Sequence, residues 1–226
     1  KEAAEQKIVF IQNVTHQVRT PLNIIMGFAQ VLRNSNGEIP HDEVKKIVDM
    51  MDHNAKTLSR MLLMLYDSSD AGASVELQIH TDEMVSCNEV ANESINFTRE
   101  HFPEINVRLE SDLPDAYRLR TNRLYLMRTL RELLYNAAKY SDGAIVLFRI
   151  QETGNTIRFI VEDQGPGMSE AYQEKMYEPF TKVNELSEGL GLGLPLSKRH
   201  SRSLGGDLFL DTSYHDDCRF ILELPK

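Results

Sequence analysis

The chain of 226 residues has no long apolar run, only two cysteines and fewer basic than acidic residues. A helix that crosses a membrane needs at least about 18 consecutive apolar residues, and no such run occurs. The first residues, KEAAEQK, are charged and lack the apolar core of an export signal. We therefore expect no membrane span and no export signal, and the abrupt helical start predicts a fragment of a longer protein.

Cysteine use and charge exclude several further classes of protein. Cys87 and Cys218 lie far apart without a CxxC motif or a His/Cys cluster, which argues against a disulfide scaffold and a zinc site. This cysteine use indicates a reducing compartment, and we expect a cytoplasmic location. The formal net charge of -9 argues against a nucleic-acid partner, because such proteins need a basic face. Any phosphate bound by this chain must be held locally.

Residues 1–70 carry apolar residues at heptad spacing in two stretches separated by the turn formers NSNGEIP, residues 34–40. The stretches contain Ile11, Val14, Val18, Pro21, Ile25, Phe28 and Leu32, then Val44, Val48, Met51, Ala55, Leu58, Leu62 and Leu65. This pattern predicts an antiparallel helical hairpin. Two helices cannot enclose a core, so we expect a homodimer whose hairpins form a four-helix bundle. The alternative is a hairpin that packs on another domain of the same chain.

Residues 71–226 mix strand and helix patterns and predict a second domain. A linker is expected at 68–74, helices near 83–99, 122–139 and 192–203, and strands at 75–80, 107–110, 207–212 and 219–225. The stretches 144–150 and 156–163 predict neighbouring strands joined by the turn QETGN. Strands in hairpins together with helices indicate an α+β layer fold rather than a regular alternation of strand and helix.

The stretch NVTHQVRTPLN, residues 13–23, places a histidine on the first predicted helix. With Ile11 at heptad position a, His16 falls at position f, so we expect it to face water. Thr20 lies one turn further on the same outer face, and Pro21 is expected to bend the helix. A lone exposed histidine is usually an ordinary surface residue, so a function for His16 needs a chemical partner elsewhere in the chain.

The stretch LRELLYNAAKY, residues 130–140, could supply part of that partner. Glu132, Asn136 and Lys139 fall at i, i+4 and i+7, which places them on one polar face of a helix. A carboxylate, an amide oxygen and an ammonium group on one line could hold Mg²⁺ and a nucleotide phosphate, since hard cations prefer oxygen ligands. A solvated helix face is the alternative.

Two glycine-rich stretches follow. In VEDQGPGM, residues 161–168, Asp163 ends a strand, and Gly165 and Gly167 allow close approach of a flat ligand. The Asp163 carboxylate can accept a hydrogen bond from an amine of that ligand. A simple turn is the alternative reading. In EGLGLGLPLSK, residues 188–198, three glycines precede a helix whose first amides could face phosphates: Gly189, Gly191 and Gly193. Neither the P-loop nor the Rossmann spacing is present.

In this order the motifs resemble the transmitter core of a sensor histidine kinase of two-component signalling. THQVRTPL resembles the phosphoacceptor box, LRELLYNAAKY the N box, EDQGPGM the G1 box, EPFTKV the F box and GLGLGL the G2 box. The resemblance covers nearly the whole chain. It implies a dimerisation and histidine-phosphotransfer hairpin at 1–70 and an ATP-binding domain at 71–226, with the α/β sandwich shared by gyrase, Hsp90 and MutL ATPases.

The resemblance also implies the cofactors, the partners and the role of each matched residue. ATP and Mg²⁺ would be bound, the chain would form a homodimer, and the phosphate would pass to an aspartate of a response-regulator receiver domain. The chain would be the intracellular part of a longer, membrane-anchored sensor. The implied catalytic residues are His16 as the nucleophile, Gln17, Thr20 as a residue of the phosphatase reaction, and Glu132. Residues implied in nucleotide binding are Asn136, Lys139, Tyr140, Asp163, Gly165, Gly167, Phe180, Lys182, Gly189, Gly191 and Gly193, with Asn136 and Glu132 at the metal and 168–190 as the ATP lid.

Gln17 departs from the family pattern, in which an acidic residue directly follows the histidine and takes up its proton. Glutamine can accept a hydrogen bond but cannot act as a general base. One alternative function is therefore a degenerate kinase that serves as a dimeric signalling scaffold or a response-regulator phosphatase. A second alternative is a related ATPase of DNA topology or chaperoning.

Overall fold

A computed structural model describes residues 2–184, 187, 189–214 and 217–226 of the chain, with side chains from residue 8 onward. The helices are α1 (Glu2–Asn34), α2 (His41–Asp67), α3 (Asp70–Glu76), α4 (Cys87–His101), α5 (Arg123–Tyr140), α6 (Glu170–Gln173) and α7 (Gly193–Ser203). The strands are β1 (Glu83–Val85), β2 (Val107–Ser111), β3 (Leu119–Thr121), β4 (Val146–Thr153), β5 (Thr156–Glu162), β6 (Asp207–Leu210) and β7 (Arg219–Pro225).

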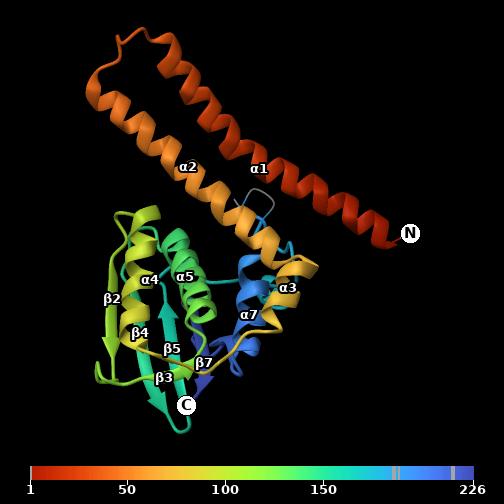
Figure 1. Cartoon of the computed structure of the whole chain (residues 1–226), viewed down its shortest axis with the longest axis vertical. Helices are drawn as coiled ribbons and strands as arrows, with labels where there is room; N and C mark the ends of the chain where they lie inside the picture. Colours follow the sequence, from red (N-terminus) through yellow and green to blue (C-terminus); the bar gives the residue numbers. More distant parts are fainter. Residues whose placement is uncertain (1, 185–186, 188, 215–216) are drawn as a thin grey trace.

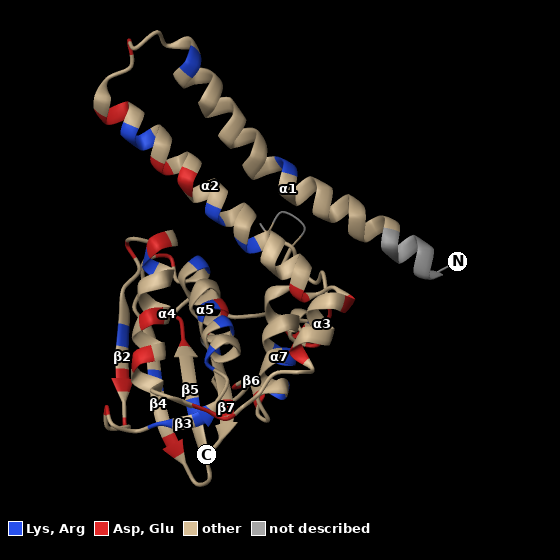
Figure 2. Ribbon diagram, viewed as in Figure 1, with Lys and Arg blue, Asp and Glu red and all other residues tan. Residues whose placement is uncertain are grey.

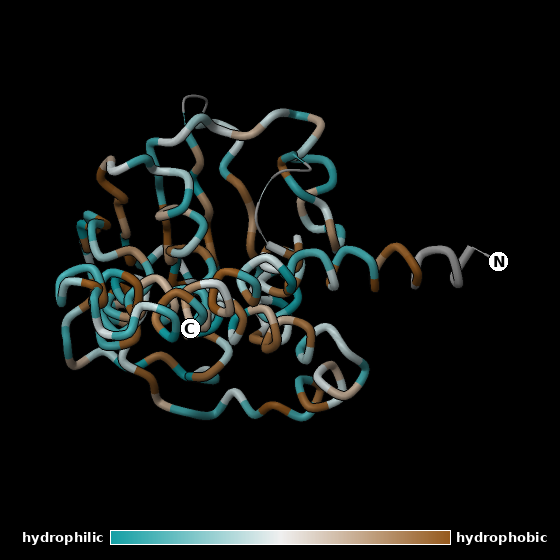
Figure 3. The backbone as a smooth tube through the Cα atoms, turned by 90° about the horizontal axis from the view of Figure 1, so that it is seen from above, coloured by the Kyte–Doolittle hydropathy of each residue, from teal (hydrophilic) through white to brown (hydrophobic). Residues whose placement is uncertain are grey.

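Helices α1 and α2 form the predicted antiparallel hairpin, which projects from the rest of the chain (Figure 1). The connection turns sharply because Asn36 and Gly37 adopt φ values of 47° and 83°, in the region that glycine and asparagine tolerate best. Pro21 lies inside α1 and is buried. Seen from above, the N-terminal part of α1 extends beyond the second domain (Figure 3). The lower half of the hairpin lies beside that domain, so the alternative packing within one chain is realised for part of its surface.

The second domain has the predicted mixed sheet with helices on one face. Its five strands follow the order β2-β4-β5-β7-β6, in which β2 and β4 run parallel and the other neighbours are antiparallel. Strands β4 and β5 form the hairpin expected around QETGN, with Thr153 opposite Thr156. Helices α4, α5 and α7 cover one face of the sheet (Figure 1). This two-layer arrangement confirms the predicted α+β sandwich.

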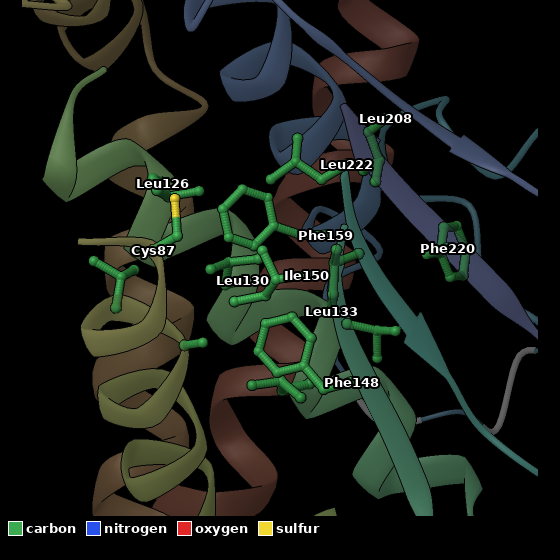
Figure 4. Close-up of a cluster of buried hydrophobic side chains, with 14 of the residues drawn as sticks. Cys87, Leu126, Leu130, Leu133, Phe148, Ile150, Phe159, Leu208, Phe220 and Leu222 are labelled. Atoms are coloured by element: carbon green, nitrogen blue, oxygen red, sulfur yellow. The ribbon is translucent and has the colours of Figure 1, made fainter. Parts of the chain in front are cut away.

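The core of this domain lies between the sheet and its helices, as Figure 4 shows. Phe148 of β4 and Phe159 of β5 are fully buried and meet the apolar stripe of α5, which includes Leu126, Leu130 and Leu133. The same spacing that buries these leucines turns Asn136 away from the core. The core therefore fixes which face of α5 is available to a ligand.

The region that joins the two domains differs from the sequence-based expectation. The predictions of a linker at 68–74 and a strand at 75–80 were wrong, because α3 occupies 70–76. Ser69 caps this helix by accepting a hydrogen bond from the amide of Gly72, and Glu76 at its end is buried against Arg199 of α7. The helix expected from residue 83 begins at Cys87, where Ser86 provides the cap, and 83–85 form β1. Tertiary ion pairing and capping have overridden a short alternating pattern.

Acidic and basic side chains alternate along α2 and around α4 and α5 (Figure 2). No helix within the described residues is long and apolar enough to span a membrane.

Candidate nucleotide and phosphoacceptor site

A cavity of about 540 Å³ lies where the hairpin meets the second domain. Its wall combines residues of the phosphoacceptor motif with residues of the nucleotide motifs. The predicted site residues on this wall are His16, Gln17, Thr20, Glu132, Asn136, Lys139, Tyr140, Lys182, Gly189, Gly191 and Gly193. The fold thus brings together side chains that are more than 100 positions apart in the sequence.

His16 and Thr20 lie on the exposed face of α1, as the heptad pattern predicts. The Thr20 hydroxyl is 3.5 Å from the backbone carbonyl of His16, one turn earlier. Both side chains border the cavity, so the water-facing side of α1 is also the side that faces the nucleotide motifs. An imidazole in this position is accessible to a phosphate held inside the cavity.

Helix α5 contributes the polar face that the i, i+4, i+7 spacing predicts. Its N-cap residue Asn122 accepts a hydrogen bond from the amide of Tyr125, and this fixes where the helix begins. Glu132, Asn136 and Lys139 then line the cavity one above another. The amine of Lys139 lies 5.3 Å from the ring centre of Tyr140, the last residue of the helix.

Helix α7 begins at Gly193, directly after the glycine-rich loop. Its N-cap residue is Leu192, which has no side-chain acceptor for the first amides of the helix, so these amides remain available to an anion. A Cβ added to Gly193 would lie 1.9 Å from Oε1 of Glu132, so only glycine fits beside that carboxylate. The helix start therefore adjoins both the cavity and Glu132.

Asp163, Gly165, Gly167 and Phe180 do not line the cavity. The first three form a loop that adjoins its rim, because a Cβ added to Gly165 would lie 2.6 Å from the carbonyl oxygen of Tyr140. Phe180 instead lies 4.8 Å, centre to centre, from the ring of Phe10 on α1. Its amide also donates a hydrogen bond of 2.9 Å to the carbonyl of Gly191, so Phe180 contacts both the hairpin and the glycine-rich loop.

Asp163 is a buried carboxylate with an unusual acidity. It is 6% exposed, and one of its oxygens accepts a hydrogen bond of 2.9 Å from the amide of Gly165. Burial raises the pKa of Asp163 to about 6, because removal from water penalises the charged form more than this hydrogen bond favours it. A ligand amine would supply the further donor that an ionised carboxylate needs.

The expected ATP lid, 168–190, is only partly described, since residues 185, 186 and 188 lie outside the described residues. Within it, Ser169 caps α6, and Lys182 donates a hydrogen bond of 3.1 Å to the carbonyl of Ser187. Burial lowers the pKa of Lys182. Lys182 also lines the cavity and so provides a second cation for phosphate.

Helix α2 contributes site residues that the sequence analysis did not identify. His53, Asn54, Thr57 and Arg60 line the cavity. His53, Thr57 and Arg60 show the same i, i+4, i+7 spacing as the polar line on α5, which is the signal that could have revealed them. Arg60 donates hydrogen bonds of 2.6 Å to both carboxylate oxygens of Glu132, whereas the sequence analysis assigned that carboxylate to a metal.

A second, smaller apolar cluster joins the hairpin to the ATPase domain. The buried members are Met61, Leu190, Leu192 and Leu196, and the partly buried ones are Val14, Val18, Met64, Leu65 and Phe180. Beside this cluster the amide of Gly189 donates a hydrogen bond of 3.2 Å to Oε1 of Gln17. Gln17, which stands where the family pattern has an acidic residue, therefore contacts the glycine-rich loop.

The residues around the cavity fit a magnesium ion that arrives with a nucleotide. No group of three or more His, Cys, Asp and Glu side chains that could hold a metal occurs in the part of the chain that the structure describes. Mg²⁺ commonly uses one or two protein oxygens together with substrate phosphates. Asn136 would provide such an oxygen, and Lys139 and Lys182 line the space that the phosphates would fill. Glu132 was also expected at the metal, but both of its oxygens accept from Arg60.

These features define an ATPase fold whose nucleotide site faces a histidine on a helical hairpin. Comparison with known families agrees with this definition. Residues 6–74 match the His Kinase A (phospho-acceptor) domain, and residues 121–226 match the histidine kinase-, DNA gyrase B-, and HSP90-like ATPase family. The two matches cover most of the chain. The chain belongs to the sensor histidine kinases of two-component signalling and carries their transmitter core.

Individual relatives are similar at modest identity. The chain is 26% identical to the sensor protein TorS of Escherichia coli over 100% of the chain and 24% of that protein. It is 26% identical to the sensor histidine kinase AruS of Pseudomonas aeruginosa over 99% of the chain and 23% of that protein. It thus spans about a quarter of the length of these relatives.

Solved structures show the same fold. The mycobacterial sensor histidine kinase MprB matches 64% of the chain and 97% of its own at 25% identity, with a TM-score of 0.57. The Acinetobacter baumannii histidine kinase AdeS matches 93% of the chain and 97% of its own at 18% identity, with a TM-score of 0.63. The latter match extends the likeness of fold across both domains.

Proposed function

We propose that the chain uses ATP and Mg²⁺ to phosphorylate itself on His16 and then passes the phosphoryl group to an aspartate of a receiver domain. One observation carries the proposal: His16 lies on the wall of the same cavity as Asn136, Lys139 and the glycine-rich loop. Phosphoryl transfer depends mainly on positioning and charge neutralisation. A cavity with two lysines, the amides of α7 and an exposed imidazole provides both.

In this reaction a ring nitrogen of His16 forms a bond to the γ-phosphorus of ATP. The bond between that phosphorus and the β,γ-bridging oxygen breaks, and its electron pair leaves with ADP. The ring proton of His16 passes to water, because Gln17 cannot accept it as a base. The bound magnesium would neutralise phosphate charge, with Asn136 as its protein ligand, while Glu132 stays paired with Arg60 beside it. The phosphoryl group on nitrogen is then available to a carboxylate of the receiver domain.

Exposed apolar side chains on the hairpin support a homodimer. Leu22, Ile24, Met26 and Val31 of α1 and Val48, Leu62 and Leu63 of α2 are between 38% and 62% exposed in the single chain. A second hairpin would cover this surface as a four-helix bundle. The use of ATP, with both free thiols buried, fits a cytoplasmic location.

The test is incubation of the chain with γ-labelled ATP and Mg²⁺. We expect label that is stable in base and labile in acid, that is absent from His16→Ala and that is retained in His41→Ala. His41 is the control because it is an exposed histidine of the hairpin, at the start of α2, that does not line the cavity. The labelled chain should then lose its label to an isolated receiver domain with an intact aspartate.

The same experiment separates the alternative functions. ATP hydrolysis without label on histidine would favour an ATPase of the DNA-topology or chaperone type, and the absence of nucleotide binding would favour a signalling scaffold. Acceleration of the receiver's dephosphorylation, lost in Thr20→Ala, would support the phosphatase role of Thr20.

Gln17→Glu is expected to speed up phosphorylation of His16 by about tenfold, which is less than the roughly hundredfold or more of a typical positioned general base because water already accepts the proton. A glutamate at 17 has two oxygens, so one can keep the contact with Gly189 while the other faces His16. The measurement is the initial rate of labelling at saturating ATP. Gln12→Glu, an equal change of charge on the exposed face of α1, is the control. An unchanged or lower rate in Gln17→Glu would contradict this reading of Gln17.

A further inference from the structure

A short polar contact between the two domains joins Arg60 of α2 to Glu132 of α5. One terminal nitrogen of Arg60 donates to both oxygens of Glu132 at 2.6 Å, although the residues are 72 positions apart. Their side chains are only 21% and 10% exposed. An ion pair so shielded from water is screened far less than a surface pair, and removal of one partner leaves an unpaired buried charge.

Both members of this pair are fixed by further contacts. The guanidinium carbon of Arg60 lies 3.7 Å from the ring centre of Tyr135, the next turn of α5 on the same side. Glu132 abuts the start of α7 at Gly193, where the helix dipole favours a negative charge. Arg60 therefore contacts the ATPase domain where Glu132 of α5 lies beside the start of α7.

A second anchor lies on α1, at the His16 end of the cavity. The amide of Gly189 donates to the side chain of Gln17, the residue next to His16, and Val14 and Val18 pack against the small apolar cluster around Leu190. Two anchors on two different helices restrain both the distance and the orientation of the nucleotide motifs relative to His16. Control of orientation is a large part of the rate of phosphoryl transfer.

All of these contacts join the ATPase domain to the hairpin of the same chain. We propose that Arg60 is a positioning residue: its pairing with Glu132 docks the ATPase domain on its own hairpin, so that His16 receives phosphate from the nucleotide of the same chain. The inference rests on the proposed kinase function and specifies its geometry. In a dimer without this docking, either nucleotide site could serve either histidine.

The first experiment tests Arg60 as a positioning residue. In Arg60→Glu we expect the rate of His16 labelling to fall by roughly tenfold or more, because the reversed charge repels Glu132. The rate is compared at saturating ATP for each variant, so that a change in ATP affinity does not enter it. The unfolding midpoint of the ATPase domain should stay unchanged, and Arg60→Lys should recover part of the rate. Lys56→Glu is the matched control, since Lys56 lies one turn earlier on α2 and pairs with exposed Asp52 of the same helix.

The second experiment tests transfer within one chain. His16→Ala and Asn136→Ala chains carrying different tags are co-expressed, and mixed dimers are isolated through both tags. Transfer within one chain predicts no label, because neither chain has both residues, whereas wild type paired with His16→Ala should be labelled on the wild-type chain. If the tags do not co-purify, a labelling rate per chain that is independent of protein concentration gives the same answer.

The outcomes separate the inference from the proposed function. A wild-type chain that never acquires label on His16 overturns the proposed function itself. Normal labelling of Arg60→Glu overturns the role of Arg60, and label on Asn136→Ala in the mixed dimer overturns transfer within one chain. In both of the latter cases the kinase function stands.

Discussion

Phe159→Ala is expected to lower the free energy of unfolding of the ATPase domain by about 3–5 kcal/mol. Phe159 lies on β5 with 0% exposure and faces Ile150 and Leu222 of the neighbouring strands. Its removal leaves a cavity between the sheet and α5, in a core that is too closely packed to collapse fully. The measurement is chemical denaturation followed by a signal from the sheet.

The control for this substitution is Leu124→Ala on α5. Leu124 is 54% exposed, so the same kind of truncation there should change the unfolding free energy by less than about 0.5 kcal/mol. A loss below about 1 kcal/mol for Phe159→Ala would show that this core is more plastic than its packing indicates.

The second large effect is expected at Asp163. Asp163→Asn should weaken ATP binding roughly 10- to 150-fold, since a hydrogen bond to a charged group is worth roughly 1.5–3 kcal/mol. The variant keeps the size of the side chain and the acceptor for the amide of Gly165, so the loop should hold its shape. Calorimetric titration of the chain with ATP measures the change, with Asp217→Asn, a neighbouring carboxylate, as the control.

The raised pKa of Asp163 makes this prediction depend on pH. Because burial raises the pKa to about 6 and only the ionised form accepts from an amine, wild-type affinity for ATP should fall about tenfold per pH unit below 6. The Asn variant should show no such dependence. Affinity that is flat between pH 5 and 7 in both proteins would exclude an ionised Asp163 as the ligand of the amine.

The pH dependence of folding stability tests Asp163 independently, in the protein without nucleotide. A carboxyl group whose folded-state pKa is raised from 3.8 to about 6 stabilises the fold below 3.8, and this contribution is lost as the pH rises through 6. Asp163→Asn should therefore leave the thermal midpoint at pH 7 unchanged or higher, although nucleotide binding is weakened. A variant that both unfolds earlier and binds ATP normally would contradict the functional role of Asp163.

The sequence predicted those site features that depend on local periodicity. The heptad phase placed His16 on the outer face of α1, and the 3.6-residue period placed Glu132, Asn136 and Lys139 on one side of α5. Both placements follow from a helix geometry that neighbouring residues impose on each other. The roles of these residues remain predictions of the family resemblance.

Contacts that are distant in the sequence could not be predicted in this way. Arg60 has no local signal for its bond to Glu132, since its partner lies in another domain. The strand predicted at 75–80 was wrong because Glu76 is held in a helix by hydrogen bonds from Arg199 and Ser203 of α7, which the local pattern does not show. The contact of Phe180 with Phe10 also lacked a local signal, because the two rings come from different domains, and the role of Phe180 in nucleotide binding stays a prediction.

The small apolar cluster between the hairpin and the ATPase domain also affects how readily the two domains separate. The apolar cluster around Met61 and Leu190 is separate from the core beneath the sheet, so the ATPase domain can leave the hairpin without unfolding. Docked and released forms are then two populations of one molecule, and about 1.4 kcal/mol changes their ratio tenfold. Val14 and Val18 of α1 pack against this cluster, so loss of their contacts would favour the released form. The packing of α1 on the small cluster thus helps to set the fraction of chains in which His16 borders the nucleotide motifs.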